Sequence, residues 1–207
     1  MKNFGLTGPS GAGKGAACAI FADYGIPSVD TDRVYHELLA EGGAMTAELI
    51  SAFGADILTE GIVDRKKLGA TVFGHSDTAK RLHILNAITH KYVLERSFAL
   101  IAEMARQGAK AALIDAPQLF EAGLEKHCDL VIGVLADTEV RLARILQRDG
   151  ITREAAMKRL NAQHSADFFR EHCHVILENN SDLSALRAQI HAFLKDQGLL
   201  SVRKELS

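Results

Sequence analysis

The chain contains few cysteines and prolines and no tryptophan. Among 207 residues there are three cysteines and three prolines. Cys18, Cys128 and Cys173 are widely separated and form no C-x-x-C pair. This spacing argues against a disulfide framework or a zinc site and fits a reducing compartment. The scarcity of proline makes long helices plausible.

The sequence also lacks a strong charge balance and a long apolar run. Its formal net charge is −2, so no overall basic field points to nucleic acid, and any anion site must be local. No apolar run is long enough to span a membrane, and the N-terminal one is too short for the core of a signal peptide. We therefore expect a cytoplasmic protein with no nucleic-acid or membrane partner, and no protein partner is evident.

Short apolar runs alternate with helical patterns along the chain. The runs predict strands at residues 4–7, 26–29, 111–114, 130–135 and 175–177. Apolar strands separated by helices are typical of a parallel sheet covered on both faces, hence an α/β fold. We expect one domain over residues 1–207, with its core at about 1–32, 108–137 and 172–200. Helical insertions are expected at about 33–107, as a side subdomain, and at about 138–171.

A glycine-rich segment between the first strand and the first helix matches the phosphate-binding pattern G-x-x-x-x-G-K. It runs from Gly8 to Gly15, with Lys14 as the cation. Backbone N–H groups of such a turn surround phosphate oxygens, and the helix N-terminus and lysine add positive charge. The expected nucleotide-binding residues are Gly8, Gly11, Ala12, Gly13, Lys14, Gly15 and Ala16. At position 15 glycine replaces the Ser or Thr whose hydroxyl normally contacts Mg²⁺.

Acidic residues follow the predicted strands. Asp30, Asp32, Asp115 and Glu178 all lie at strand ends, where ligands bind in open α/β sheets. A carboxylate of the Asp30-Thr31-Asp32 pair can hold Mg²⁺ or accept a proton from an attacking hydroxyl. The alternative is that these residues only cap the following helix.

The segment 138–171 is rich in arginine and is interpreted as a lid over a nucleotide. Arg144 and Arg148, four residues apart, share one helix face, and guanidinium groups stabilise the charge that develops in phosphoryl transfer. The alternative for these residues is a solvated helix face with ion pairs. The run His172-Cys173-His174 lacks partners at metal-ligand spacing, which disfavours a metal role.

Taken in order, these features resemble the dephospho-coenzyme A kinase family over nearly the whole chain. The matching segments are Gly5-Leu6-Thr7-Gly8, Val29-Asp30-Thr31-Asp32, Phe53-Gly54, Asp64 to Leu68, Val72-Phe73, Leu85 to His90, Pro117 to Glu121, Arg148-Asp149-Gly150, Arg159 to Gln163, and Ile176 to Asn179. Three positions depart from the family pattern: Gly15, Lys91 in place of a proline, and Gln118 in place of a leucine.

The resemblance implies a P-loop kinase fold with a helical substrate-binding insertion and a helical lid. It implies phosphorylation of the ribose 3′-hydroxyl of dephospho-coenzyme A, the last step of coenzyme A synthesis, with ATP as donor and Mg²⁺. The implied catalytic residues are Asp32, as base, with Lys14 and Arg144. Arg148 and Asn179 would join the nucleotide site, and Asp32 and Asp115 would face the metal. The implied substrate-binding residues are Asp30, Asp32, His90, Pro117 and Phe120.

Two other functions compete with this one. A shikimate-kinase-like enzyme would also carry Asp30-Thr31-Asp32 after the second strand, but it expects a Gly-Gly-Gly turn after the third. Here Asp115-Ala116-Pro117 stands at that place. A nucleotide-binding regulator that has lost catalysis would explain Gly15, yet it would not need Lys14, Asp32 and the lid arginines.

Overall fold

The computed structural model describes residues 1–200, so the last seven residues of the predicted domain, 201–207, lie outside the described residues. The chain divides into two compact units. Unit 1 combines residues 1–29 with the described residues from 103 onward, and unit 2 comprises residues 30–102. Each unit is described by itself below.

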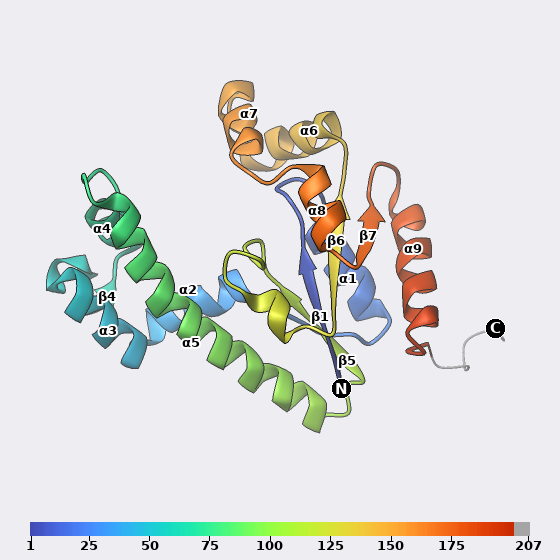
Figure 1. The fold of residues 1–207 in the computed structure, drawn as a ribbon, viewed down its shortest axis with the longest axis horizontal. Helices are drawn as coiled ribbons and strands as arrows, with labels where there is room; N and C mark the ends of the chain where they lie inside the picture. The colour runs from blue at the N-terminus through green and yellow to red at the C-terminus, as the bar shows by residue number, and fades with distance from the viewer. Residues whose placement is uncertain (201–207) are drawn as a thin grey trace. The chain divides into compact units, whose positions relative to one another are not determined.

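A five-stranded sheet forms the centre of unit 1 (Figure 1). Its order is β2-β5-β1-β6-β7, and β1 pairs in parallel with β5 and β6, as β6 does with β7. The strands are β1 (Lys2–Thr7), β2 (Ser28–Asp30), β5 (Ala111–Asp115), β6 (Leu130–Leu135) and β7 (Val175–Glu178). The predicted α/β fold with a parallel sheet is confirmed, although β2 begins two residues later than expected.

The middle of this sheet is buried because its strands carry apolar side chains on both faces. Phe4 and Leu6 of β1 are fully buried. Helices α1 (Lys14–Asp23) and α9 (Leu183–Asp196) pack together on one side of the sheet (Figure 1), and Phe193 of α9 meets Phe4 edge to face at 5.2 Å between ring centroids. This core fixes the ends of β1 and α1, between which the glycine-rich loop lies.

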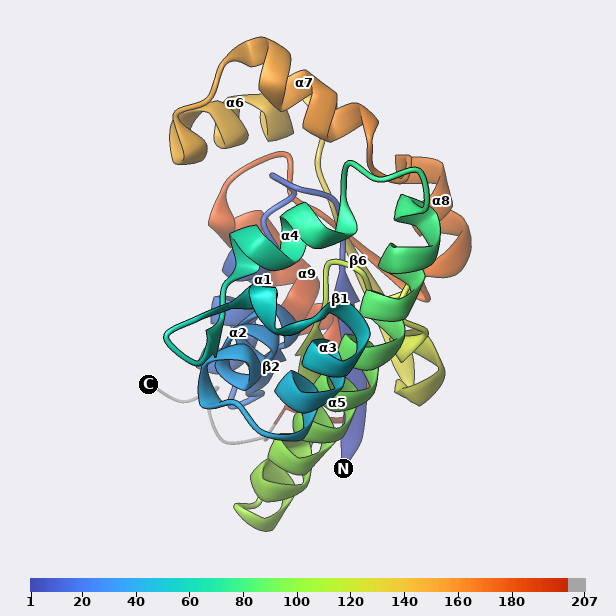
Figure 2. The ribbon, with the colours of Figure 1, turned by 90° about the vertical axis from the view of Figure 1, so that its left-hand side faces the viewer.

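Three short helices occupy the segment predicted as a lid. They are α6 (Thr138–Asp149), α7 (Arg153–Asn161) and α8 (Ala166–His172), and a 3₁₀ helix, η2, covers Leu124–His127 before β6. Figure 2 shows α6 and α7 side by side. They share a small buried core made of Leu142, Ile145, Ala156 and Leu160. The pair α6–α7 therefore has apolar packing of its own.

Unit 2 is mostly helical and has its own core. It contains α2 (Thr31–Glu41), α3 (Ala44–Phe53), the 3₁₀ helix η1 (Ala55–Ile57), α4 (Arg65–Val72) and most of α5 (Thr78–Arg106). Met45, Leu49 and Ile57 are almost fully buried in the core. The 29-residue length of α5 follows from a stretch, 75–107, that contains neither proline nor glycine.

One small element of unit 2 differs from the sequence-based expectation. A two-stranded antiparallel hairpin, β3 (Leu58–Thr59) and β4 (Ile62–Val63), lies within the segment predicted to be helical. Its two-residue turn consists of Glu60 and Gly61, both with positive φ. Strands of two residues are too short to show an alternating pattern, which is why the hairpin escaped sequence analysis.

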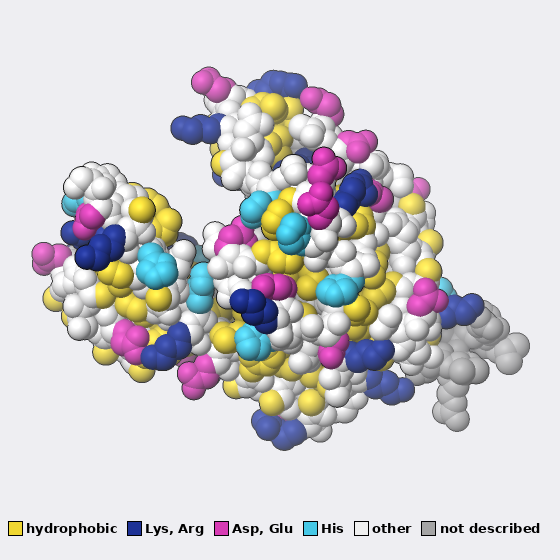
Figure 3. Space-filling model, in the orientation of Figure 1, with side chains coloured by type: hydrophobic (Ala, Val, Ile, Leu, Met, Phe, Trp, Pro, Cys, Tyr) yellow, Lys and Arg dark blue, Asp and Glu magenta, His cyan; other side chains and the backbone are white. Residues whose placement is uncertain are grey.

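The surface carries mixed charge, and within residues 1–200 no helix combines the length and apolar character needed to cross a lipid bilayer. Figure 3 shows basic and acidic side chains interspersed on the face that it draws. A local anion site must therefore come from particular backbone and side-chain groups rather than from a broad field.

Candidate active site

The glycine-rich loop emerges from the centre of the sheet. In the parallel register Leu6 lies beside Asp115 of β5 and Thr7 beside Gly133 of β6. Residues 8–13 then leave the carboxyl edge of the sheet, and α1 begins at Lys14. Buried strands on both sides of β1 thus hold the loop where ligands bind in this class of sheet.

Close packing explains why the loop needs glycine at position 13. Gly13 is the N-cap of α1 and has φ 99°, a backbone conformation that other residues rarely adopt. A Cβ there would lie 2.1 Å from Nδ2 of Asn179. Asn179 is itself buried, and its Nδ2 donates to the carbonyl of Ala12 at 2.7 Å. Asn179 therefore holds the loop in place, and its predicted role in the nucleotide site stays a prediction.

Side chains donate to the carbonyl groups of Ser10, Gly11 and Ala12, whereas most N–H groups of the loop form no hydrogen bond within the described residues. Arg144 Nη1 donates to the carbonyls of Gly11 and Ala12 at 3.3 and 3.4 Å, and its Nη2 donates to the carbonyl of Asn179 at 3.0 Å. In the part of the chain that the structure describes, five N–H groups between Gly11 and Ala16 form no hydrogen bond: those of Gly11, Gly13, Lys14, Gly15 and Ala16. Unpaired N–H groups around a helix N-terminus form a binding site for phosphate oxygens.

Lys14 and Asp115 supply opposite charges beside the loop. Lys14 Nζ lies 3.8 Å from Asp115 Oδ1, and the two side chains are only 18% and 17% exposed. Cys18 Sγ, one turn along α1, donates to Asp115 Oδ2 at 3.5 Å. Burial, and then the charge of Asp115, raises the pKa of Cys18 to about 12, so this thiol stays neutral at physiological pH. Lys14 is therefore a cation at the start of α1 beside the loop, and Cys18 is no nucleophile.

The residues around the loop fit a nucleotide-bound Mg²⁺ better than a permanent metal centre. No group of three His, Cys, Asp or Glu side chains suited to a metal ion occurs within residues 1–200. Mg²⁺ in phosphoryl-transfer sites is held by one or two carboxylates together with phosphates and water, and Asp115 offers one such carboxylate. Gly15 offers no hydroxyl, but a Cβ built on it meets no atom within 4 Å, so a side chain has room there.

The structure brings Arg144 to the loop and places Arg148 differently. Arg148 donates to both carboxylate oxygens of its neighbour Asp149, at 2.6 and 3.0 Å, and Arg159 of α7 also pairs with Asp149. The hydrogen bonds from Arg148, followed by those from Arg159, lower the pKa of Asp149 to about 2. The ion-pair alternative thus describes Arg148 as it stands, and its role toward a nucleotide stays a prediction.

Pro117 and Phe120 follow β5 in unit 1. The carbonyl of Pro117 accepts a hydrogen bond from Thr7 Oγ1 at 3.5 Å, next to the start of the loop. Phe120 meets the ring of Phe168 of α8 edge to face, with 5.3 Å between centroids. Phe120 is therefore anchored to the end of the lid segment, and its contact with a substrate stays a prediction.

The other predicted substrate residues belong to unit 2. Asp30 is the N-cap of α2, and its Oδ1 accepts from the N–H groups of Asp32 and Arg33 at 2.9 and 3.1 Å. The capping alternative therefore accounts for the hydrogen bonds of Asp30. Asp32 is exposed in the first turn of the helix, and His90 is half-buried on α5. Lys91 pairs with Glu48 of α3 at 2.7 Å.

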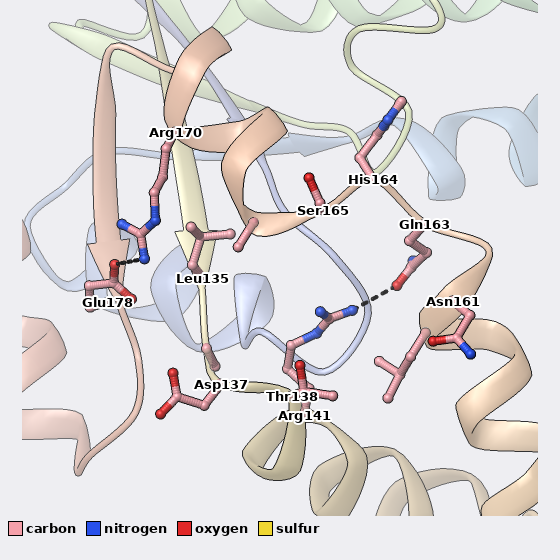
Figure 4. Close-up of a pocket in the computed structure, with 13 residues that line it drawn as sticks. Leu135, Asp137, Thr138, Arg141, Asn161, Gln163, His164, Ser165, Arg170 and Glu178 are labelled. Atoms are coloured by element: carbon pink, nitrogen blue, oxygen red, sulfur yellow. Dashed lines mark hydrogen bonds and ion pairs between the residues drawn. The ribbon is translucent and has the colours of Figure 1, made fainter.

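Sequence analysis missed two residues that contact the loop, Arg141 and Gln163. Arg141 stands one turn before Arg144 on α6, and its position in the arginine-rich segment was the one available signal. Both residues also line a cavity of about 430 Å³ at the ends of β6 and β7 (Figure 4). No residue of the loop itself lines this cavity, which is therefore separate from the N–H groups described above.

Comparison with known proteins identifies the family of this chain. A profile of the family described as dephospho-CoA kinase matches residues 3–185. The chain belongs to the dephospho-CoA kinase family. A dephospho-CoA kinase of Geobacillus kaustophilus is 34% identical over 192 residues, which cover 92% of this chain and 94% of the relative.

Solved structures agree with the family assignment. The dephospho-CoA kinase from Campylobacter jejuni superposes with a TM-score of 0.69 and 26% identity, covering 95% of this chain and 98% of the other. A shikimate kinase from Acinetobacter baumannii in complex with shikimate has a TM-score of 0.51 at 16% identity, covering 100% and 96%. The latter likeness shows the P-loop kinase fold alone, which members of the dephospho-CoA kinase family share.

Proposed function

We propose that this protein transfers the γ-phosphoryl group of ATP to the ribose 3′-hydroxyl of dephospho-coenzyme A, giving coenzyme A and ADP. The observation that carries the proposal is the loop with five unpaired N–H groups and Lys14, within a chain that matches the kinase family over residues 3–185. A kinase needs this arrangement because catalysis of phosphoryl transfer consists mainly of positioning and charge stabilisation.

In the proposed reaction the loop and Lys14 hold the β- and γ-phosphates of ATP. The 3′-hydroxyl oxygen of the acceptor forms a bond to the γ-phosphorus while the bond from that phosphorus to the β,γ-bridging oxygen breaks. Asp32 accepts the hydroxyl proton, and the electron pair of the broken bond leaves on ADP. Lys14 neutralises the charge that gathers on the bridging and γ-oxygens. Asp30, His90, Pro117 and Phe120 are proposed to contact the acceptor.

Mg²⁺ is proposed to accompany ATP. It would supply positive charge to the phosphate oxygens. Asp115 and, by family analogy, Asp32 are the carboxylates proposed to face it, with water at the place of the hydroxyl that Gly15 lacks. Arg148 is proposed to reach the nucleotide when its contact with Asp149 opens. The three free thiols fit a cytoplasmic enzyme.

The test is a coupled assay of ADP release with dephospho-coenzyme A as acceptor, with adenosine and shikimate as control acceptors. Of the three acceptors, we expect only dephospho-coenzyme A to support turnover. Mass spectrometry should show a product that carries one additional phosphoryl group. Turnover with shikimate instead would favour the competing kinase, and nucleotide binding without turnover on any acceptor would favour a regulator.

A further inference from the structure

Helix α6 and the residue that follows α7 are both attached to a single residue of the phosphate-binding loop, Ser10. Arg141, in the first helix of the lid, donates from Nε to the carbonyl of Ser10 at 3.0 Å. Gln163, just after the second helix, accepts from the N–H of Ser10 at 3.0 Å through Oε1. The same Oε1 accepts from Nη2 of Arg141 at 3.0 Å, as Figure 4 shows. The three residues thus form a closed ring of hydrogen bonds.

Burial of the charged Arg141 side chain costs free energy, which indicates that this residue has a function. Arg141 is only 8% exposed, and within residues 1–200 it forms no ion pair. Burial without an opposite charge lowers the pKa of its guanidinium. A buried cation that is satisfied only by a carbonyl and an amide contributes little to stability, so an apolar residue would suit the packing equally well.

Backbone packing at the same point makes the loop sensitive to α6. A Cβ on Gly11, which has φ 79°, would lie 2.6 Å from the carbonyl oxygen of Arg141. The N–H of Gly11 is the first of the five that remain unpaired. Ser10, which Arg141 bonds, therefore directly precedes the residues whose N–H groups would surround phosphate.

We propose that Arg141 and Gln163 are positioning residues that preorganise the phosphate-binding loop by fixing Ser10 to the pair α6–α7. They contact no phosphate themselves. Their removal lets the loop sample conformations in which its N–H groups diverge, so nucleotide affinity falls while the rest of the fold is retained. This inference rests on the proposed function only in that the loop binds a nucleotide.

The chemistry of Gln163 allows a sharp test, because the ring uses only its acceptor oxygen. Gln163→Met keeps the length of the side chain and removes the acceptor, whereas Gln163→Glu keeps an oxygen that accepts from both donors. Arg141→Met removes the other side of the ring. Gln147→Met is the matched control, because Gln147 is an exposed glutamine of the same lid. ADP affinity is measured by calorimetry, and melting temperature and the KM values for both substrates are measured in parallel.

We expect Gln163→Met to raise the Kd for ADP and the KM for ATP by about fivefold, the scale of one or two net hydrogen bonds. Gln163→Glu and Gln147→Met should stay within about twofold of the parent. Arg141→Met should resemble Gln163→Met, and the double variant should be no worse than either single one, because both act through one ring.

Three results would overturn the inference. The first is an unchanged Kd for ADP in Gln163→Met. The second is equal damage from Gln163→Glu and Gln163→Met. The third is a loss that raises both KM values together with a lower melting temperature. Either of the last two patterns indicates a merely structural role. Because ADP binding does not depend on the acceptor, a failure of the dephospho-coenzyme A assay would leave this test intact.

Discussion

Replacing Gly15 by serine should restore a metal ligand that this chain lacks. Gly15 is the second residue of α1, its φ is not positive, and a Cβ added to it meets no atom within 4 Å. Serine therefore enters without steric cost. Its hydroxyl would take the place of a water in the coordination shell of the proposed Mg²⁺, and water exchanges freely whereas a side chain is held in place.

The size of the effect can be set from one net polar interaction. About 1 kcal/mol corresponds to roughly a fivefold change in an equilibrium constant. We therefore expect the Mg²⁺ concentration that gives half-maximal turnover to fall about fivefold in Gly15→Ser. A change of helix propensity accompanies it, because glycine in a helix interior is about 1 kcal/mol less favourable than alanine and roughly half that less favourable than serine.

Gly15→Ala separates these two contributions. Alanine gives the larger gain in helix propensity but has no hydroxyl, so it should raise the melting temperature and leave the Mg²⁺ requirement unchanged. The assay is a Mg²⁺ titration of ADP release at saturating ATP and dephospho-coenzyme A for all three proteins. A Mg²⁺ requirement in Gly15→Ser equal to that of Gly15→Ala would refute the reasoning and show that Asp115 and water already complete the site.

Three further predictions concern the charged residues. Lys14→Ala should abolish detectable turnover and lower the melting temperature only modestly, because Lys14 belongs to no apolar core cluster and its ion pair with Asp115 is long, at 3.8 Å; near-normal turnover would contradict the phosphate role of the loop. Asp32→Asn should lower kcat by about 10²-fold, the scale of losing a general base, with little change in ADP affinity by calorimetry. A larger effect of Asp30→Asn would reverse the two roles. Arg144→Ala should weaken ADP binding more than Arg148→Ala does, since Arg144 holds the loop carbonyls and Arg148 holds Asp149; equal losses in calorimetry would count against that distinction.

The sequence predicts the sheet and the loop because both depend on local patterns. An apolar run such as Leu130 to Leu135 is buried on both faces when it forms a strand of a parallel sheet that helices cover. The sheet contains every strand that was expected. The pattern from Gly8 to Lys14 likewise fixes a strand, a turn and a helix in that order. The hairpin around Glu60 and Gly61 was not predicted, because its strands are shorter than any periodicity.

The partners of individual arginines could not be predicted in the same way. A helical spacing of four places Arg144 and Arg148 on one face, yet one bonds to loop carbonyls and the other to an adjacent carboxylate. Arg141 is a stronger case. Nothing in its neighbourhood along the chain distinguishes a buried cation from a solvated one, because its partners Ser10 and Gln163 are distant in the sequence or belong to a loop.

The distribution of hydrogen bonds around the loop has a consequence for catalysis. Buried backbone groups need partners, and here side chains of α6 and Asn179 satisfy the carbonyls of Gly11 and Ala12. Arg141 and Arg144 of α6 are thus bonded to loop carbonyls, while five N–H groups between Gly11 and Ala16 form no hydrogen bond in the described part of the chain. Charge that develops on a transferring phosphoryl group must then be met by Lys14 and these N–H groups. Arg141 and Arg144 can share that charge only by giving up a bond that they now make, so their contribution to turnover should be smaller than that of Lys14.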